Sequence, residues 1–245
     1  MAPTAKPADA RRSFVDRMPR GVQPYLRLMR ADRPIGTWLL FIPCLWGLAL
    51  ARLETARAAS LKEVLLFALG ALVMRGAGCA YNDIVDRDFD AGVARTRNRP
   101  IPSGQVSVAA AKAFMIGLCL VGLLVLVQFN GTTIALGIAS LALVAIYPFM
   151  KRYTYWPQLV LGLTFKWGAL VGWTAARGRL EWPAVLLYAG SVLWTIGYDT
   201  IYAHQDKEDD LAMGLKSTAI RFGEATRTWV GAFYLGALAL CTAAM

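Results

Sequence analysis

The chain has 245 residues, is 57% apolar, and contains repeated uncharged stretches of about 17 to 25 residues, which excludes an ordinary soluble protein and indicates a polytopic membrane protein. Its formal net charge of +10 is carried by the segments between these stretches. The charge therefore indicates membrane topology, and nucleic acid is excluded as a partner while the lipid bilayer is expected as one.

The N-terminal segment is polar and basic. Residues 1–20 are rich in Ala, Pro and Arg, which predicts a disordered arm. Residues 22–31 have the pattern of an amphipathic helix that lies on the membrane surface. Because residues 1–33 carry eight basic side chains and lack an apolar core, we predict no cleavable signal peptide. Residues 21–245 are then expected to form one transmembrane domain.

Seven apolar runs are long enough to cross a bilayer as helices. They lie at about residues 35–52, 64–82, 110–128, 131–149, 158–176, 183–203 and 228–245. Eighteen basic residues fall in the segments on one side of these runs and five on the other. The positive-inside rule then places the N-terminus and both long loops in the cytoplasm. The four cysteines lack a Cys-x-x-Cys spacing, so we interpret them as small packing residues.

The second apolar run ends in a cluster of acidic residues, NDIVDRDFD. Asn82, Asp83, Asp86 and Asp90 have spacings that place them on one helix face, whereas Asp88 points elsewhere. Carboxylates at this density repel one another unless a cation neutralises them, and an oxygen-only ligand set is typical of Mg2+. The cluster therefore predicts a Mg2+ site completed by water and phosphate oxygens. A solvated acidic helix end is the alternative.

The sixth run ends in a second acidic cluster, YDTIYAHQDKEDD. Asp206, Asp209 and Asp210 are related as i, i+3 and i+4, and Asp199 lies above them on the same face. Glu208 falls off this face and is expected to be solvated. The two clusters together predict one polyanion held by bridging metal ions.

Basic residues accompany both acidic clusters. A diphosphate keeps negative charge even with two Mg2+ ions bound, so nearby ammonium and guanidinium groups would complete its neutralisation. Ordinary positive-inside loop charge is the alternative for any one of these residues. The basic companions are Arg95, Arg97, Arg99, Lys151, Arg152 and Lys216.

Two basic residues lie inside apolar runs, and a charge within a membrane is a functional-site hypothesis by default. Arg75 and Lys166 would suit an anionic acceptor, with snorkelling or ion pairing as the alternative. Aromatic residues near the acidic clusters could stabilise a carbocation through their ring faces. We select Tyr147, Tyr198 and Tyr202 for this role, although most aromatic residues near span ends serve as interfacial anchors.

Several motifs in a fixed order resemble the UbiA superfamily of intramembrane aromatic prenyltransferases, and within it the bacterial 4-hydroxybenzoate polyprenyltransferases. The resemblance runs from about residue 30 to the end of the chain. It rests on RPIGTWLLFIPCLWGL, on MRGAGCAYNDIVDRDFD followed by RTRNRPIPSG, and on YPFMKRYTYWPQ, YDTIYAHQDKEDD and GLKSTAIRFG.

The resemblance implies an all-α helical bundle, commonly of nine spans, around a central cavity with two Asp-rich motifs and Mg2+ at its cytoplasmic mouth. With seven spans, the chain looks C-terminally incomplete relative to that family. The resemblance also implies active-site roles for Arg152 and Lys216, whereas Lys166 stands where a small or neutral residue is expected. The metal-binding positions that it implies are Asn82, Asp83, Asp86, Asp90, Asp199, Asp206, Asp209 and Asp210.

The expected activity is Mg2+-dependent transfer of an all-trans polyprenyl group from its diphosphate to the ring of 4-hydroxybenzoate, in ubiquinone biosynthesis at the bacterial inner membrane. A naphthoate, homogentisate or haem acceptor is the nearest alternative. A divalent-cation transporter is an alternative of another class. Transporters usually hold their ion near the bilayer midplane on broken helices, whereas these carboxylates gather at span ends with basic companions.

Overall fold

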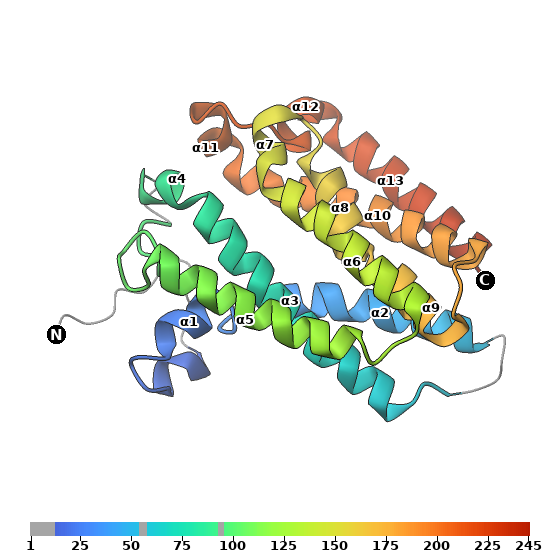
Figure 1. Cartoon of the computed structure of the whole chain (residues 1–245). Coiled ribbons are helices and arrows are strands. Elements are labelled where there is room, and N and C mark those ends of the chain that lie inside the picture. The colour runs from blue at the N-terminus through green and yellow to red at the C-terminus, as the bar shows by residue number, and fades with distance from the viewer. Residues whose placement is uncertain (1–12, 54–57, 93–95) are drawn as a thin grey trace. The chain divides into compact units, whose positions relative to one another are not determined.

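The predicted all-α fold is confirmed for the residues that the structure describes. A computed structural model covers residues 13–53, 58–92 and 96–245, and within these ranges every regular element is a helix (Figure 1). The bounds are as follows, with η marking a short 3-10 helix: η1 (Phe14–Arg17), α1 (Gln23–Leu28), α2 (Ile35–Leu53), α3 (Leu61–Val85), α4 (Arg87–Gly92), α5 (Val108–Leu126), α6 (Gly131–Ile146), η2 (Tyr147–Phe149), α7 (Met150–Tyr153), α8 (Pro157–Lys166), α9 (Gly168–Arg177), α10 (Trp182–Ala203), η3 (His204–Asp206), α11 (Lys207–Ala212), α12 (Thr218–Phe222), η4 (Gly223–Ala225) and α13 (Thr226–Ala243).

Six helical stretches in the described ranges are long and apolar enough to cross a membrane, one fewer than the sequence predicts. Each of the six overlaps one of the first six predicted runs. The seventh predicted run forms α13, whose first turn contains Arg227 and two threonines and is therefore less apolar. The six stretches are Ile35–Leu53, Leu61–Val85, Val108–Leu126, Gly131–Tyr153, Pro157–Arg177 and Trp182–Asp206.

The chain divides into two compact units. Unit 1 consists of residues 1–38 and 65–128, and unit 2 consists of residues 39–64 and 129–245. The predicted single domain over residues 21–245 is therefore built from two units, and the chain passes from one to the other within α2 and again within α3.

The core of unit 1 includes the N-terminal helix that the sequence places on the membrane surface. Leu28 of α1 is fully buried with Ala80 and Ile84 of α3, and the rings of Tyr25 and Phe114 lie 5.3 Å apart. This packing corrects the prediction of a surface helix, because the apolar face of α1 finds a protein partner within its own unit.

Part of the predicted disordered arm is also ordered. Residues 1–12 lie outside the described residues, but η1 follows directly from Ser13. Val15 is fully buried, and Asp16 forms an ion pair of 3.1 Å with Arg27 of α1. The turn is therefore part of unit 1.

Small residues allow a close helix crossing in unit 2. A β-carbon added at Gly47 of α2 would overlap the carbonyl oxygen of Ala169, and one added at Gly172 of α9 would overlap that of Cys44. Cys44 also donates a hydrogen bond of 3.4 Å to the carbonyl oxygen of Leu40. Helices in membranes pack closely where such small residues meet. Cys44 lies at this crossing, in agreement with its interpretation as a packing residue.

Adding one methyl group at this crossing should destabilise the protein. We expect Gly172→Ala to cost about 1 to 3 kcal/mol, because backbone atoms of α2 must move. Gly117→Ala in α5 is the matched control, since a β-carbon there meets nothing within 4 Å. This variant should be as stable as the wild type or more stable by up to about 1 kcal/mol, because alanine reduces the conformational freedom of the unfolded chain. Thermal melting in detergent measures both, and equal melting temperatures would contradict the close crossing.

Candidate functional site

The first acidic cluster lies where α3 ends and the backbone bends before α4. Two hydrogen bonds of helical spacing cross the bend, from Asp86 N to Asn82 O (2.9 Å) and from Asp90 N to Asp86 O (2.8 Å). Asp83, Asp86 and Asp90 are consequently buried, with 0%, 2% and 7% of their surfaces exposed. The side chain of Asp88 is 83% exposed, in agreement with its predicted place off this face.

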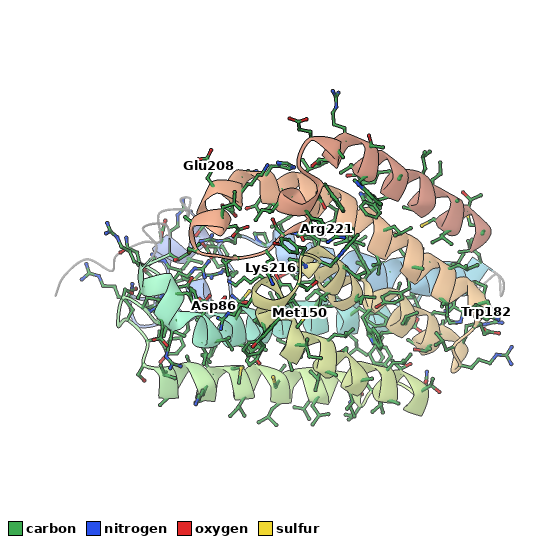
Figure 2. The ribbon with its side chains drawn as sticks, turned by 90° about the horizontal axis from the view of Figure 1, so that it is seen from above. Asp86, Met150, Trp182, Glu208, Lys216 and Arg221 are labelled. Carbon is green, nitrogen blue, oxygen red and sulfur yellow. The ribbon has the colours of Figure 1, made fainter. Side chains whose placement is uncertain are left out.

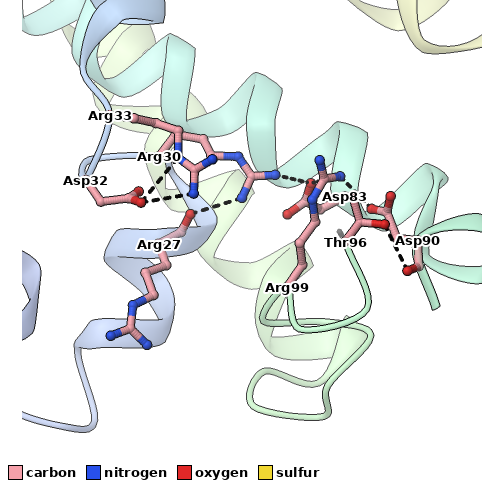
Figure 3. Close-up of polar contacts among 8 residues, drawn as sticks. All are labelled: Arg27, Arg30, Asp32, Arg33, Asp83, Asp90, Thr96 and Arg99. Atoms are coloured by element: carbon pink, nitrogen blue, oxygen red, sulfur yellow. Dashed lines mark hydrogen bonds and ion pairs between the residues drawn. The ribbon is translucent and has the colours of Figure 1, made fainter. Parts of the chain in front are cut away.

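Two arginines form ion pairs with the buried carboxylates of Asp83 and Asp90 (Figure 3). Arg99 Nη1 donates to Asp90 Oδ2 at 2.6 Å and to Asp83 Oδ1 at 3.3 Å, so one guanidinium nitrogen bridges the two side chains. Arg30 Nη2 donates to the same Asp83 oxygen at 2.8 Å. The second oxygen, Asp83 Oδ2, is buried and makes no hydrogen bond with any residue that the structure describes. The cluster therefore holds more acceptor capacity than its arginines satisfy.

The loop that carries Arg99 is fixed at both ends. The Arg99 amide donates to the carbonyl oxygen of Thr96 at 2.8 Å, and the Thr96 hydroxyl donates to the carbonyl oxygen of Asp90 at 3.0 Å. Further along, Ile101 and Val106 are buried in the core of unit 1. The RTRNRPIPSG stretch thus positions a guanidinium against the acidic cluster, as the pairing of the two motifs predicts.

Sequence reasoning missed Arg30. It follows α1 with φ of 60°, and the backbone closes two bonds typical of a Schellman cap, from Ala31 N to Leu26 O (2.9 Å) and from Arg30 N to Arg27 O (3.1 Å). Glycine is the usual residue at this position, because a side chain in the left-handed region costs about 1 kcal/mol. Since the sequence has no glycine there, no pattern marked the turn that directs this guanidinium to Asp83.

The second acidic cluster begins in the last turns of α10 and continues through η3 into α11 without a break in helical structure. Asp199 lies in α10, Asp206 ends η3 and Asp210 lies in α11, and all three are partly buried. Glu208 is exposed on α11, as its spacing predicts (Figure 2). Unit 2 thus presents this cluster on consecutive helical segments.

Two predicted site residues cannot be placed. Arg95 and the side chain of Asp209 lie outside the described part of the chain.

The single histidine, His204, is exposed, and its Nε2 atom lies 3.1 Å from the hydroxyl of Thr226. This contact gives His204 a partner outside the acidic residues.

The YPFMKRYTYWPQ and GLKST stretches meet in unit 2 (Figure 2). The Lys216 amide donates to the carbonyl oxygen of Lys151 at 2.8 Å, and the Lys216 ammonium donates to that of Tyr153 at 3.2 Å. The Thr218 amide donates to Gln158 Oε1 at 3.1 Å. Hydrogen bonds therefore connect two motifs that are about 60 residues apart in sequence, and Lys216 makes two of these bonds.

The remaining predicted basic residues lie in different surroundings. The Arg152 guanidinium lies 5.8 Å from the ring centre of Phe149. The Arg75 guanidinium in unit 1 packs so tightly over Gly36 that a β-carbon there would overlap it. Arg97 is exposed, unlike Arg99 in the same loop. Arg99 is the predicted basic residue whose guanidinium bridges Asp83 and Asp90 in the first acidic cluster.

Lys166 lies inside unit 2 among aromatic rings. Only 4% of its surface is exposed, and its Nζ atom lies 5.6 Å from the ring centre of Trp46 and 5.9 Å from that of Tyr198. Of the other predicted aromatic residues, Tyr147 is partly buried whereas Tyr202 is 55% exposed. The three predicted tyrosines therefore differ in exposure, and the ring of Tyr198 faces a lysine.

The described residues contain no group of three or more His, Cys, Asp or Glu arranged to hold a metal. The first cluster nevertheless fits Mg2+ in its chemistry, because two carboxylates converge on one cationic nitrogen of Arg99 and Asp83 Oδ2 has no donor. Mg2+ is commonly bound by one or two protein carboxylates, with phosphate and water as its other ligands.

Residues 40–245 match the model of the UbiA prenyltransferase family. The chain belongs to this family. Among curated members, the human "4-hydroxybenzoate polyprenyltransferase, mitochondrial" is 54% identical over 233 residues, which is 93% of this chain and 62% of the human protein. The Aedes aegypti protein of the same name is 56% identical over 211 residues, which is 86% of this chain and 48% of its own length. This UbiA chain thus spans about half to three fifths of these relatives.

Solved UbiA structures share the fold. A UbiA homolog from Aeropyrum pernix K1 in its apo form is 27% identical, with a TM-score of 0.68 and coverage of 82% of this chain and 76% of that one. A UbiA homolog from Archaeoglobus fulgidus bound to GPP and Mg2+ is 19% identical, with a TM-score of 0.73 and coverage of 90% and 77%. The second likeness concerns the fold alone.

The UbiA assignment agrees with a multi-pass membrane protein, which the six apolar helical stretches also indicate. The curated relatives named above are mitochondrial, whereas the sequence pattern suggested a bacterial inner membrane. The compartment in the names of these relatives therefore differs from the one predicted from the sequence.

Proposed function

We propose that the chain catalyses Mg2+-dependent transfer of an all-trans polyprenyl group from its diphosphate to the ring of 4-hydroxybenzoate, ortho to the hydroxyl, with release of diphosphate. The observation that carries the proposal is the buried carboxylate pair, Asp83 and Asp90, around one arginine nitrogen in a UbiA chain. The names of the curated relatives, which are more than 50% identical, support the choice of substrates.

Eight residues in the two acidic clusters would hold Mg2+, which when bound would neutralise charge on the diphosphate leaving group. In the first cluster, Asp83 Oδ2 supports this role because it is buried without a donor. The Mg2+ bound by the Archaeoglobus fulgidus homolog supports a divalent metal in the family. The proposed ligands are Asn82, Asp83, Asp86 and Asp90, and Asp199, Asp206, Asp209 and Asp210.

The basic residues act on the same leaving group. When the allylic C–O bond breaks, its electron pair stays on the diphosphate oxygen, and cationic donors stabilise this charge. The ring carbon ortho to the acceptor hydroxyl then bonds to the allylic carbon, and loss of its proton restores aromaticity. We assign donor roles to Arg95, Arg97, Arg99, Lys151, Arg152 and Lys216, and we add Arg30 because it shares an Asp83 oxygen with Arg99.

Orientation and compartment form part of the proposal. We propose that the N-terminus and both acidic clusters face the cytoplasm of a bacterium, with the chain in the inner membrane. Eighteen basic residues lie in the segments on that side of the spans and five in the segments on the other side, which supports this orientation.

Product formation with defined acceptors tests the activity. Membranes containing the protein are incubated with Mg2+, a polyprenyl diphosphate and 4-hydroxybenzoate, and we expect prenylated 4-hydroxybenzoate by mass spectrometry. Chelation with EDTA should abolish product, and added Mg2+ should restore it, because the acidic clusters need a cation to receive diphosphate. If product forms only with naphthoate, homogentisate or haem, that compound is the acceptor in place of 4-hydroxybenzoate. Divalent-cation flux without any prenylated product would instead favour a transporter.

A further inference from the structure

Lys166 is a buried ammonium without an anionic partner. It ends α8 in the middle of an apolar stretch, where the helix is interrupted at Trp167 before α9 begins. In the described part of the chain the Lys166 ammonium makes no hydrogen bond and no ion pair. Its polar interactions there are cation–π contacts with the rings of Trp46 and Tyr198. Ring faces offset only part of the cost of burying a charge.

Two buried hydroxyl groups lie on α10, the helix that packs against α8. Among the described residues Ser191 Oγ makes no hydrogen bond, and Tyr198 Oη has only the Thr195 side chain of its own helix beside it. They are seven residues apart and so share one face of α10. A β-carbon at Gly162, one turn before Lys166 in α8, would contact Thr195, which lies between them on α10. This face of α10 is therefore turned toward α8.

These groups define the chemistry of a ligand. An ammonium offers three donors, and each hydroxyl can donate or accept. Trp46, whose ring faces Lys166, also stacks on Trp194 with ring centres 5.8 Å apart and an interplanar angle of 11°, so flat apolar surfaces adjoin the charge. One positive charge beside aromatic rings suits a monoanion on a flat ring. A diphosphate would require more positive charge than one ammonium supplies.

We propose that Lys166 binds the carboxylate of the aromatic acceptor, with the Tyr198 hydroxyl as second donor and Trp46 beside the acceptor ring. The inference rests on the proposed function and assigns the acceptor end of that site. It also revises the role of Tyr198, because a ring face already occupied by an ammonium does not stabilise a second cation. Lys166 is then a specificity-determining residue that favours anionic acceptors over neutral phenols.

Binding measurements without Mg2+ or diphosphate test the site independently of turnover. Isothermal titration of the full chain in detergent compares 4-hydroxybenzoate with its neutral analogue 4-hydroxybenzamide. We expect Lys166→Met to weaken benzoate binding by about 10- to 100-fold and to leave benzamide binding unchanged, because only the charge-assisted contact is lost. Lys166→Arg should retain benzoate binding within about 10-fold. Lys112→Met, at an exposed position on α5, is the matched control and should bind like the wild type.

The ligand-free protein supplies a second readout. Lys166→Met should raise the melting temperature, because it removes a buried charge that lacks a protein partner. Unchanged benzoate affinity in Lys166→Met, or equal loss of both ligands, would overturn the proposed anchor. The two proposals fail separately: charge-dependent benzoate binding without prenylated product would contradict the function alone, whereas prenylation by Lys166→Met with an unchanged KM for benzoate would contradict the anchor alone.

Discussion

Replacing Asp86 or Asp206 with alanine is expected to reduce prenyl transfer by about 1,000-fold or more while the protein stays in the membrane. Each residue belongs to one acidic cluster, and the proposed reaction requires both clusters to neutralise the departing diphosphate. Asp86 is 2% exposed at the bend between α3 and α4. Asp206 ends η3 beyond α10. The rate of product formation per amount of inserted protein is the relevant measurement.

Neighbouring acidic residues provide matched controls for this experiment. Asp88→Ala and Glu208→Ala each remove a carboxylate from the same clusters, but both side chains are exposed and lie off the proposed metal-binding faces. We expect these variants to keep activity within about threefold of the wild type, since surface substitutions seldom disturb a fold. Full activity in either Asp86→Ala or Asp206→Ala would refute the model of two metal-binding clusters.

Loss of Arg99 should destabilise unit 1 even when no substrate is present. Its guanidinium bridges Asp83 and Asp90, and Arg99→Met would leave two buried carboxylates near each other with Arg30 as their counter-ion among the described residues. Breaking a buried ion pair on one side costs about 3 kcal/mol or more. We therefore expect a melting temperature in detergent that is lower by several degrees.

A divalent cation and a neighbouring arginine distinguish this effect from a general loss of charge. Mg2+ should raise the melting temperature of Arg99→Met more than that of the wild type, because the carboxylates then lack one of their two guanidinium partners. Arg97→Met in the same loop is the control and should melt like the wild type, since Arg97 is exposed. Equal melting of the two variants would show that the Arg99 bridge contributes nothing to stability.

Periodicity and hydropathy predict much of this protein correctly. Six predicted apolar runs correspond to helical stretches, because the bilayer thickness fixes a minimum length that can be read directly from the sequence. The separation of Asp88 from Asp83, Asp86 and Asp90 was also predicted, since helical spacing decides which side chains share a face.

Other features depend on contacts that no local pattern encodes. Arg30 reaches Asp83 across 53 positions in sequence, through a turn without the usual glycine. The apolar face of α1 could equally cover lipid or protein, and only the packing of Leu28 against Ala80 and Ile84 decides between them. The interruption after Lys166 was missed because the run from 158 to 176 is apolar on both sides of it.

The left-handed turn at Arg30 has a consequence for engineering. Glycine would relieve the backbone at this position by about 1 kcal/mol, so a substitution scheme based on backbone angles alone would choose Arg30→Gly. The same exchange would remove a guanidinium from Asp83, a carboxylate that the proposed chemistry requires. Because Asp83 is buried, loss of this guanidinium costs about 3 kcal/mol or more, so Arg30→Gly should lower heat resistance as well as turnover. A library that is scored only on folding would therefore keep the arginine.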